Sequence, residues 1–203
     1  MAVSYPLTMP AGLQSARFEL LSNTAAHISP RTKASQVVER QGALWRANFQ
    51  IKPVKRANAA AWTAFFTSLR GMFGTFYGFD PAATTPLGSA PGTPIVKGAS
   101  QTGHSLITDG WGLSESDIMK AGDYFQLGTW YHMVVVDADS DGVGTGESTL
   151  EIEPQLRASP ADNASIVTAS PKMIMRLGGN VVGWDEDVAQ IYGFSFSAIE
   201  NIT

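Results

Sequence analysis

Residues 43–81 read ALWRANFQIKPVKRANAAAWTAFFTSLRGMFGTFYGFDP, and the hydrophobic period changes twice within them. In the first part, Trp45, Ala47, Phe49 and Ile51 alternate with polar residues. This period of two is typical of a strand with one buried face. The stretch therefore begins with a predicted strand that packs one side against a core.

The second part of the stretch, residues 56–70, has a helical spacing of large apolar side chains: Trp62, Phe65, Phe66 and Leu69. This i, i+3, i+4, i+7 pattern predicts an amphipathic helix, and Gly71 occupies the position of a left-handed C-terminal cap. An aromatic segment follows and ends at Asp80-Pro81, which indicates a further strand and a turn.

Two shorter strands are predicted before the quoted stretch, at Ala16–Leu21 and Ser35–Arg40. A polar stretch that ends in a Ser29-Pro30 turn separates them. We expect both strands to pair with the strand that contains Trp45.

The rest of the chain indicates a second β unit. A proline-rich stretch from Asp80 to Gly98 predicts an extended connector, because proline cannot donate to a sheet ladder. Beyond it, closely spaced strand-like runs predict a small barrel or sandwich, namely SLITDGW, DYFQLGTW, TWYHMVVVDA, STLEIEPQL and SIVTA.

The strand-like runs after Pro171 need a partner, and we expect them to return to the first unit. The predicted fold class is mainly β, with β-sandwich or barrel units and one amphipathic helix. Residues 1–85 and 171–203, including the helix at 56–70, form one predicted domain. Residues 86–170 form a small barrel-like domain inserted into it.

Composition excludes several classes of function. The chain has 203 residues, a net charge of −4 and no cysteine, so neither a disulfide scaffold nor a thiolate metal site is possible. No basic surplus is present for phosphate binding, and we expect no specific nucleic-acid binding. Neither a signal peptide nor a membrane span is evident, so we expect no membrane partner and synthesis in a cytoplasm.

Asp137, Asp139, Asp141 and Gly142 spell the start of a calcium loop, D-x-D-x-D-G. The match ends there, since Ser148 stands where the loop requires a bidentate glutamate. We therefore expect an exposed hairpin turn, and whether the loop holds an ion is left open.

The other candidate reactive groups show no catalytic spacing. The three histidines are far apart in sequence and are expected to be surface or turn residues: His27, His104 and His132. The acidic clusters Glu151/Glu153 and Asp185/Glu186/Asp187 could serve a cell-wall hydrolase, but alternation and turn context favour solvated faces. We predict no catalytic, cofactor-binding or metal-ligating residue, no cofactor and no enzymatic activity.

The five tryptophans divide into two groups. Trp45 and Trp62 lie in register with apolar stripes and are predicted core residues. The other three border turns and are the candidates for surface anchors that could stack on sugars: Trp111, Trp130 and Trp184.

Most of the chain resembles a known family. The resemblance runs from SARFELLSNTAAHISP (15–30) through residues 42–81 to TPLGSAPGTPIVKGASQTGHSLITDGW (85–111) and KAGDYFQLG (120–128). These segments resemble tail-tip structural proteins of long-tailed bacteriophages and prophages, in particular the distal tail proteins of siphophages. The shared pattern consists of packing and turn positions.

The resemblance implies a virion structural protein that is assembled in the host bacterial cytoplasm. In that family the protein forms a ring, typically a hexamer, which joins the tail tube protein to the tail-tip hub protein. The ring-forming part would be residues 1–85 with 171–203, and residues 86–170 would face outward. The alternative is a receptor- or carbohydrate-binding module at the tail tip, carried by exposed aromatic residues of 86–170.

Overall fold

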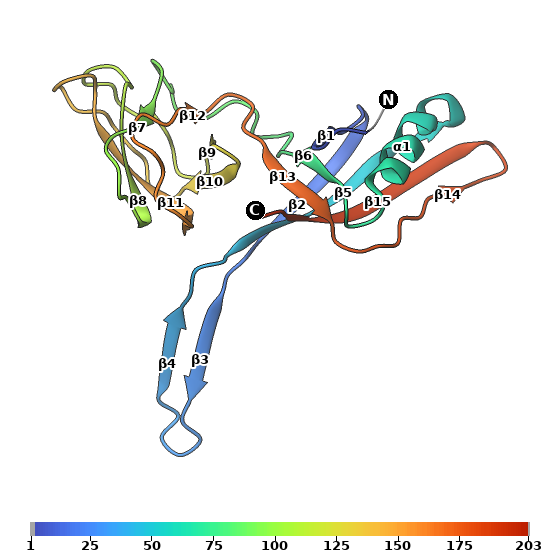
Figure 1. Ribbon diagram of the computed structural model, residues 1–203, viewed down its shortest axis with the longest axis horizontal. Helices are drawn as coiled ribbons and strands as arrows, with labels where there is room; N and C mark the ends of the chain where they lie inside the picture. Colours follow the sequence, from blue (N-terminus) through green and yellow to red (C-terminus); the bar gives the residue numbers. More distant parts are fainter. Residues whose placement is uncertain (1–2, 203) are drawn as a thin grey trace.

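The computed structural model describes residues 3–202, which form fifteen strands and one helix. This confirms the predicted fold class, mainly β with a single amphipathic helix. The body is elongated, with a barrel at one end and a large sheet covered by the helix at the other (Figure 1). A two-stranded ribbon projects from the body between them.

The large sheet has seven strands in the order β1-β6-β13-β15-β5-β2, with β14 paired to β15. It joins strands from both ends of the chain, and β1 lies parallel to β6. The members are β1 (Leu7–Thr8), β2 (Leu13–Leu21), β5 (Leu44–Lys55), β6 (Thr75–Gly78), β13 (Met173–Leu177), β14 (Asp185–Glu186) and β15 (Ile191–Glu200).

Strand β5 lies between β2 and β15 and has the predicted alternation. Trp45, Ala47, Phe49 and Ile51 are buried, whereas the intervening polar residues are exposed on the opposite face. The buried face is covered by α1 (Arg56–Leu69). The alternation thus fixes which side of the sheet the helix covers.

Helix α1 is stabilised by its packing against the sheet. Its N-terminus contributes little, because its first turn has no acidic residue and Lys55 makes no side-chain cap. Its stripe contacts β15, with the Phe66 and Phe196 ring centroids 5.0 Å apart. The helix ends one residue earlier than predicted, because Arg70 takes the left-handed cap at φ 53° and Gly71 continues at φ +67°.

The second sheet has six strands in the order β12-β9-β10-β11-β8-β7. A bridge between Ile95 and Ser165 links its two outer ends, so the sheet closes almost completely into a barrel. We call residues 95–167 the barrel. Its strands are β7 (Ile95–Val96), β8 (Gly103–Asp109), β9 (Tyr124–Leu127), β10 (Trp130–Val134), β11 (Ser148–Leu156) and β12 (Ile166–Val167).

The predicted connector, Asp80–Gly98, contains no strand as far as residue 94, but its last part includes β7 (Ile95–Val96), so the connector is shorter than predicted. It is nevertheless fixed to the barrel. The buried Asp123 carboxylate accepts hydrogen bonds from the backbone N–H groups of Leu87, Gly88 and Lys120, at 2.6–2.9 Å. The connector is therefore docked on the barrel, unlike a free linker.

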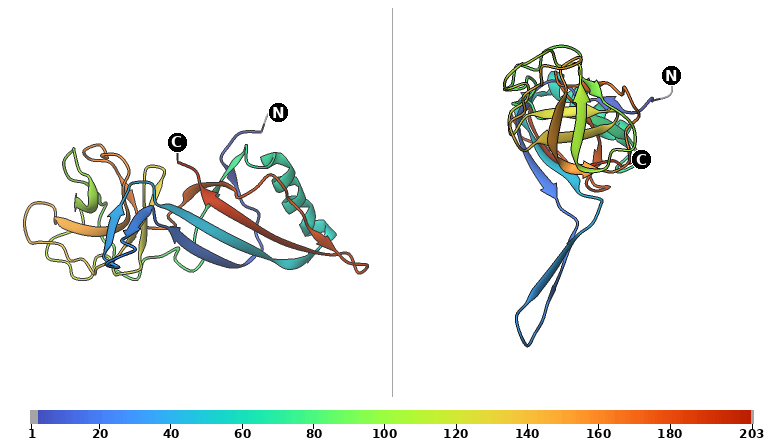
Figure 2. Two further views of the ribbon diagram at one scale, coloured as in Figure 1. Left: turned by 90° about the horizontal axis from the view of Figure 1, so that it is seen from below. Right: turned by 90° about the vertical axis from the view of Figure 1, so that its left-hand side faces the viewer.

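The projecting ribbon corrects one prediction. Strand β4 (Ser35–Glu39) pairs with β3 (Thr24–Ile28) and makes no pair with β5. The stretch expected to be a polar separator supplies β3, which leaves β2 alone on the free side of β5. We call residues 24–39 the arm, and Figure 2 shows it extending away from both β units.

Candidate functional site

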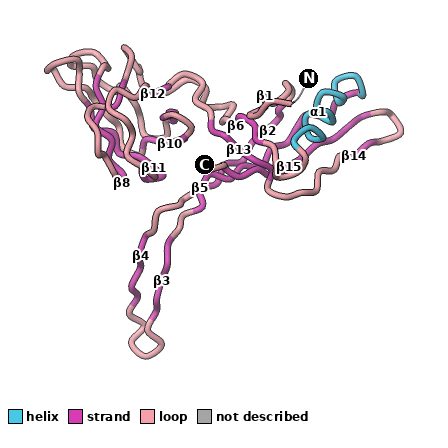
Figure 3. The backbone as a smooth tube through the Cα atoms, in the orientation of Figure 1, coloured by secondary structure: helices cyan, strands magenta, loops and turns pink. Residues whose placement is uncertain are grey.

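The arm continues the β2–β5 pair beyond the body, as the tube trace in Figure 3 shows. Arg40 N–H donates to the Asn23 carbonyl (2.8 Å), and the Asn23 side chain donates to the Gln41 carbonyl (2.7 Å). Between these links and the sheet, Gly42 at φ +109° allows the bend. The arm is thus the outer half of one long hairpin.

Every residue of β3 and β4 is exposed, including the apolar side chains of Ile28 (60%), Val37 (63%) and Val38 (48%). A two-stranded hairpin alone is marginally stable in water, and chains rarely expose such a ribbon without a partner. Two of the three charged residues in the arm are basic, Arg31 and Lys33, in a chain of net charge −4. The arm therefore presents an apolar, weakly basic surface suited to a protein partner.

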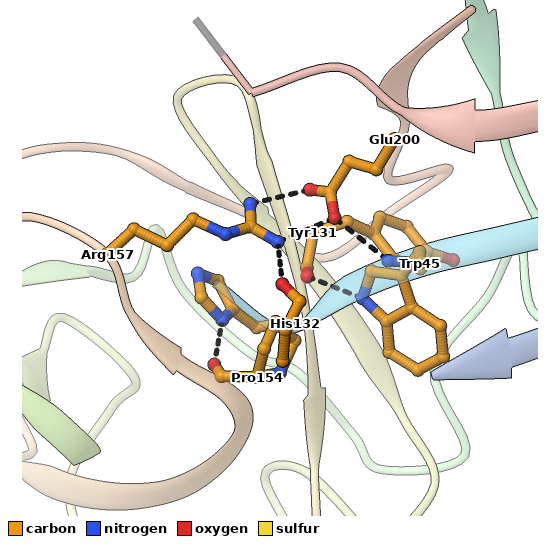
Figure 4. Close-up of polar contacts among 7 residues, drawn as sticks. Trp45, Tyr131, His132, Pro154, Arg157 and Glu200 are labelled. Atoms are coloured by element: carbon orange, nitrogen blue, oxygen red, sulfur yellow. Dashed lines mark hydrogen bonds and ion pairs between the residues drawn. The ribbon is translucent and has the colours of Figure 1, made fainter. Parts of the chain in front are cut away.

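Buried polar side chains meet at the junction between the large sheet and the barrel (Figure 4). Arg157, directly after β11, contacts Glu200, at the end of β15, through two hydrogen bonds of 2.7 and 2.6 Å. Their side chains are only 8% and 1% exposed. The same carboxylate accepts the N–H of Trp45 (3.1 Å), and Arg157 also donates to the Ala43 carbonyl (2.8 Å).

Aromatic packing closes the same junction. The Trp45 indole N–H donates to the Tyr131 carbonyl at 2.9 Å. The Tyr124 and Tyr131 rings stack with centroids 4.9 Å apart, and both lie edge-on to Trp45. The junction is a packed, connected network that holds the two sheets in one orientation.

Arg157 and Glu200 were missed by the sequence reasoning. A signal existed for Glu200, because the alternation through Phe194 and Ala198 places it on the buried face of β15. No local pattern identifies Arg157, since its partners are 43 and 114 residues away.

His132 corrects the expectation that the histidines are surface or turn residues. It lies on β10, is fully buried, and stacks on Phe125 with centroids 5.5 Å apart. Its Nδ1 donates to the Pro154 carbonyl (2.8 Å), while Nε2 has no hydrogen-bond partner among the described residues. Burial, opposed by that hydrogen bond and assisted by the nearby Arg157 charge, lowers the pKa of His132 to about 4.

Acid should therefore destabilise the fold through His132. Between pH 6.5 and pH 4, His132 is protonated in the unfolded chain but stays neutral in the folded chain, where its pKa is about 4. Stability is thus highest above pH 6.5 and falls by about 3 kcal/mol as pH drops through this window. Urea unfolding at several pH values should show a shallower acid slope for His132→Gln, and an unchanged slope for the exposed His27→Ala. Equal slopes for His132→Gln and wild type would contradict the assignment.

The other histidines are exposed or partly exposed. His27 lies on β3 in the arm. His104, at the start of β8, lies between Glu39 of the arm and Glu153 of β11. Glu39, His104 and Glu153 thus lie close together although they are far apart in the sequence.

The aspartates of the partial calcium loop each bind backbone groups. They lie in the connection between the paired strands β10 and β11. Asp137 accepts from Ala121 N–H, Asp139 from Asp117 N–H, and Asp141 from Glu147 N–H, at 2.7–2.8 Å. Within residues 3–202 they do not assemble as a metal-ligand cluster.

The remaining acidic candidates do not converge. Glu151 is exposed on β11, while Glu153, two residues further along, turns to His104. Asp185 and Glu186 are exposed on β14, where Glu186 accepts the Tyr192 hydroxyl (2.7 Å). Within the described residues, the two acidic clusters therefore lie on different strands and do not come together as one site.

The tryptophans follow the predictions except at Trp111. Trp45 and Trp62 are buried, as predicted. Trp111 is fully buried, and its indole donates to the Thr108 hydroxyl (2.7 Å), so it is no surface anchor. Trp130 is half-buried beside a hollow of about 360 Å³, and Trp184 is 43% exposed.

Within residues 3–202, no helix has both the length and the hydropathy needed to cross a membrane. In comparisons with known proteins, no family model matches the sequence and no curated protein is significantly similar to it.

Proposed function

We propose that this chain is a non-enzymatic structural subunit of a long-tailed phage virion. In this proposal it forms an oligomeric ring at the distal end of the tail, where it joins the tail tube to the tail-tip hub. The observation that supports it most is the arm, a two-stranded ribbon that is exposed along both strands and would be marginally stable on its own. The family resemblance described above makes the proposal specific.

The large sheet offers two further surfaces for assembly. Strand β2 pairs only with β5 in the described chain, so nine residues of sheet edge are available to another subunit. The sheet face opposite α1 is also uncovered and polar, with Arg46, Asn48 and Gln50 exposed. A ring of such subunits can be built from heterologous contacts that close, with this polar face toward a central channel.

Assembly should depend on the arm and tolerate salt. Size exclusion with light scattering should show a closed oligomer for the wild type, and Ile28→Asp/Val37→Asp should shift it to monomer. Thermal unfolding of the variant monomer should be little changed, because these side chains are exposed in their own chain. High salt should leave the oligomer intact, because the exposed arm contacts are mainly apolar.

Val136→Asp is the matched control, since Val136 is also exposed (56%) but lies on the barrel. It should assemble as the wild type does. A wild-type chain that stays monomeric at all concentrations, with no rings by negative-stain imaging, would count against the ring.

A receptor- or carbohydrate-binding role is the alternative proposal. Trp111 is buried and therefore does not support this role. The barrel feature that favours ligand binding is Trp130, which lines a hollow together with Pro160. Glycan binding that is lost in Trp130→Ala would support this role.

A further inference from the structure

Three potential metal ligands meet where the arm leaves the body. Glu39 ends β4, His104 lies at the start of β8 and Glu153 lies in β11. His104 Nε2 is 3.4 Å from Glu39 Oε2, and His104 Nδ1 is 3.1 Å from Glu153 Oε1. One donor atom from each residue lies within 4.8 Å of the other two.

The cluster has more acidic than basic groups and can attract a cation. Two carboxylates flank one imidazole, and in the described part of the chain their ion-pair contacts are with His104 alone. Carboxylates this close repel one another unless a proton or a metal ion lies between them. The side chains are 35–50% exposed, so an ion can enter and water can complete its coordination.

The imidazole is also placed as it is in metal sites. His104 Nδ1 is 3.3 Å from the Ile152 carbonyl, which can accept its proton. In the tautomer with the proton on Nδ1, that proton faces the Ile152 carbonyl and Glu153, and Nε2, on the Glu39 side, can donate its electron pair to an ion. Metal-bound histidines commonly have this carbonyl partner on the second ring nitrogen.

We propose that Glu39, His104 and Glu153 bind a divalent transition-metal ion of the zinc class. A mixed set of one imidazole nitrogen and two carboxylate oxygens suits Zn²⁺, with water in the fourth position. The imidazole disfavours Ca²⁺ and Mg²⁺, which prefer oxygen ligands alone. Small rotations of the two flexible glutamates bring their oxygens to bonding distance of about 2.0–2.2 Å.

The ion would fasten the arm to the barrel. The contact of 3.4 Å between Glu39 Oε2 and His104 Nε2 joins residues 24–39 to residues 95–167. Metal binding would thus set the direction of the arm relative to the body. The proposed metal site does not depend on ring formation, because the number of ions bound per chain can be measured in any oligomeric state.

Calorimetric titration of the chelator-treated full chain with ZnCl₂ tests the proposal. We expect one ion per chain, and binding at least about tenfold weaker in Glu39→Gln and His104→Ala. Glu151→Gln and His27→Ala are the matched controls, because both residues are exposed outside the cluster, and they should bind as the wild type does. Zn²⁺ should also slow tryptic cleavage at Arg31 and Lys33 of the arm in the wild type and the controls, but in neither cluster variant.

Thermal unfolding without metal should be nearly equal for all of these variants, which separates lost binding from misfolding. Absence of stoichiometric Zn²⁺ binding would overturn the proposal, and so would binding that persists in both cluster variants.

Discussion

Trp62→Ala is expected to lower the free energy of unfolding by about 3–5 kcal/mol, a large fraction of the stability of a typical domain. Trp62 is 1% exposed, and its ring lies 5.7–6.5 Å from four phenylalanine rings of α1 and β15. Its indole also donates to the Ala11 carbonyl (3.1 Å), which would lose its partner. The substitution thus creates a cavity and removes a hydrogen bond at once.

Urea unfolding followed by far-UV circular dichroism measures the effect. Trp184→Ala is the control, because Trp184 is 43% exposed and its loss should change stability by less than about 1 kcal/mol. A Trp62→Ala protein that unfolds at the wild-type urea concentration would show that the helix is not anchored through this ring.

The sequence was informative where a single element has one buried face. The alternation of β5 and the stripe of α1 repeat over several residues, so their period alone identifies the buried side. The residue types at the end of the helix predicted its last residue less accurately. Arg70 adopts the left-handed conformation that glycine was expected to supply next to it, because the helix ends where its buried stripe ends at Leu69.

Strand β4 was predicted, but β3 and the pairing of the two strands as an arm were not, because neither strand has a buried face. His132 was missed for the opposite reason. Strand β10 is buried on both sides, with Tyr131 in the core of the large sheet and Val134 in that of the barrel. The expectation for His132 rested on the lack of a metal-ligand spacing, which says nothing about burial, and a strand buried on both faces gives no alternation that would reveal it.

The Glu39–His104–Glu153 cluster was also beyond local reasoning. Its members are separated by 65 and 49 residues, as the residue numbers 39, 104 and 153 show. They meet because the arm leaves the body beside β8 and β11, which are paired neighbours in the barrel. Such a site depends on the arrangement of the two sheets, which no spacing motif encodes.

Arg157→Met is expected to destabilise the protein by about 3–5 kcal/mol, since it leaves a buried carboxylate without its counter-charge. Glu200 is 1% exposed at its side chain and would keep only the Trp45 N–H as a donor. The Ala43 carbonyl would lose its partner as well. Because the pair spans the junction, we expect the loss to loosen the barrel from the large sheet, with less cooperative thermal unfolding.

The double variant Arg157→Met/Glu200→Gln separates the buried charge from the contact itself. Its neutral side-chain amide at position 200 can still accept the Trp45 N–H, so the double variant should be more stable than Arg157→Met alone. Arg17→Met is the exposed control, because the Arg17–Glu19 pair is 77% and 30% exposed and contributes about 0–1 kcal/mol. If Arg157→Met costs no more than Arg17→Met in urea unfolding, the junction is not held by this ion pair, and aromatic packing around Trp45 must carry the coupling between the two sheets.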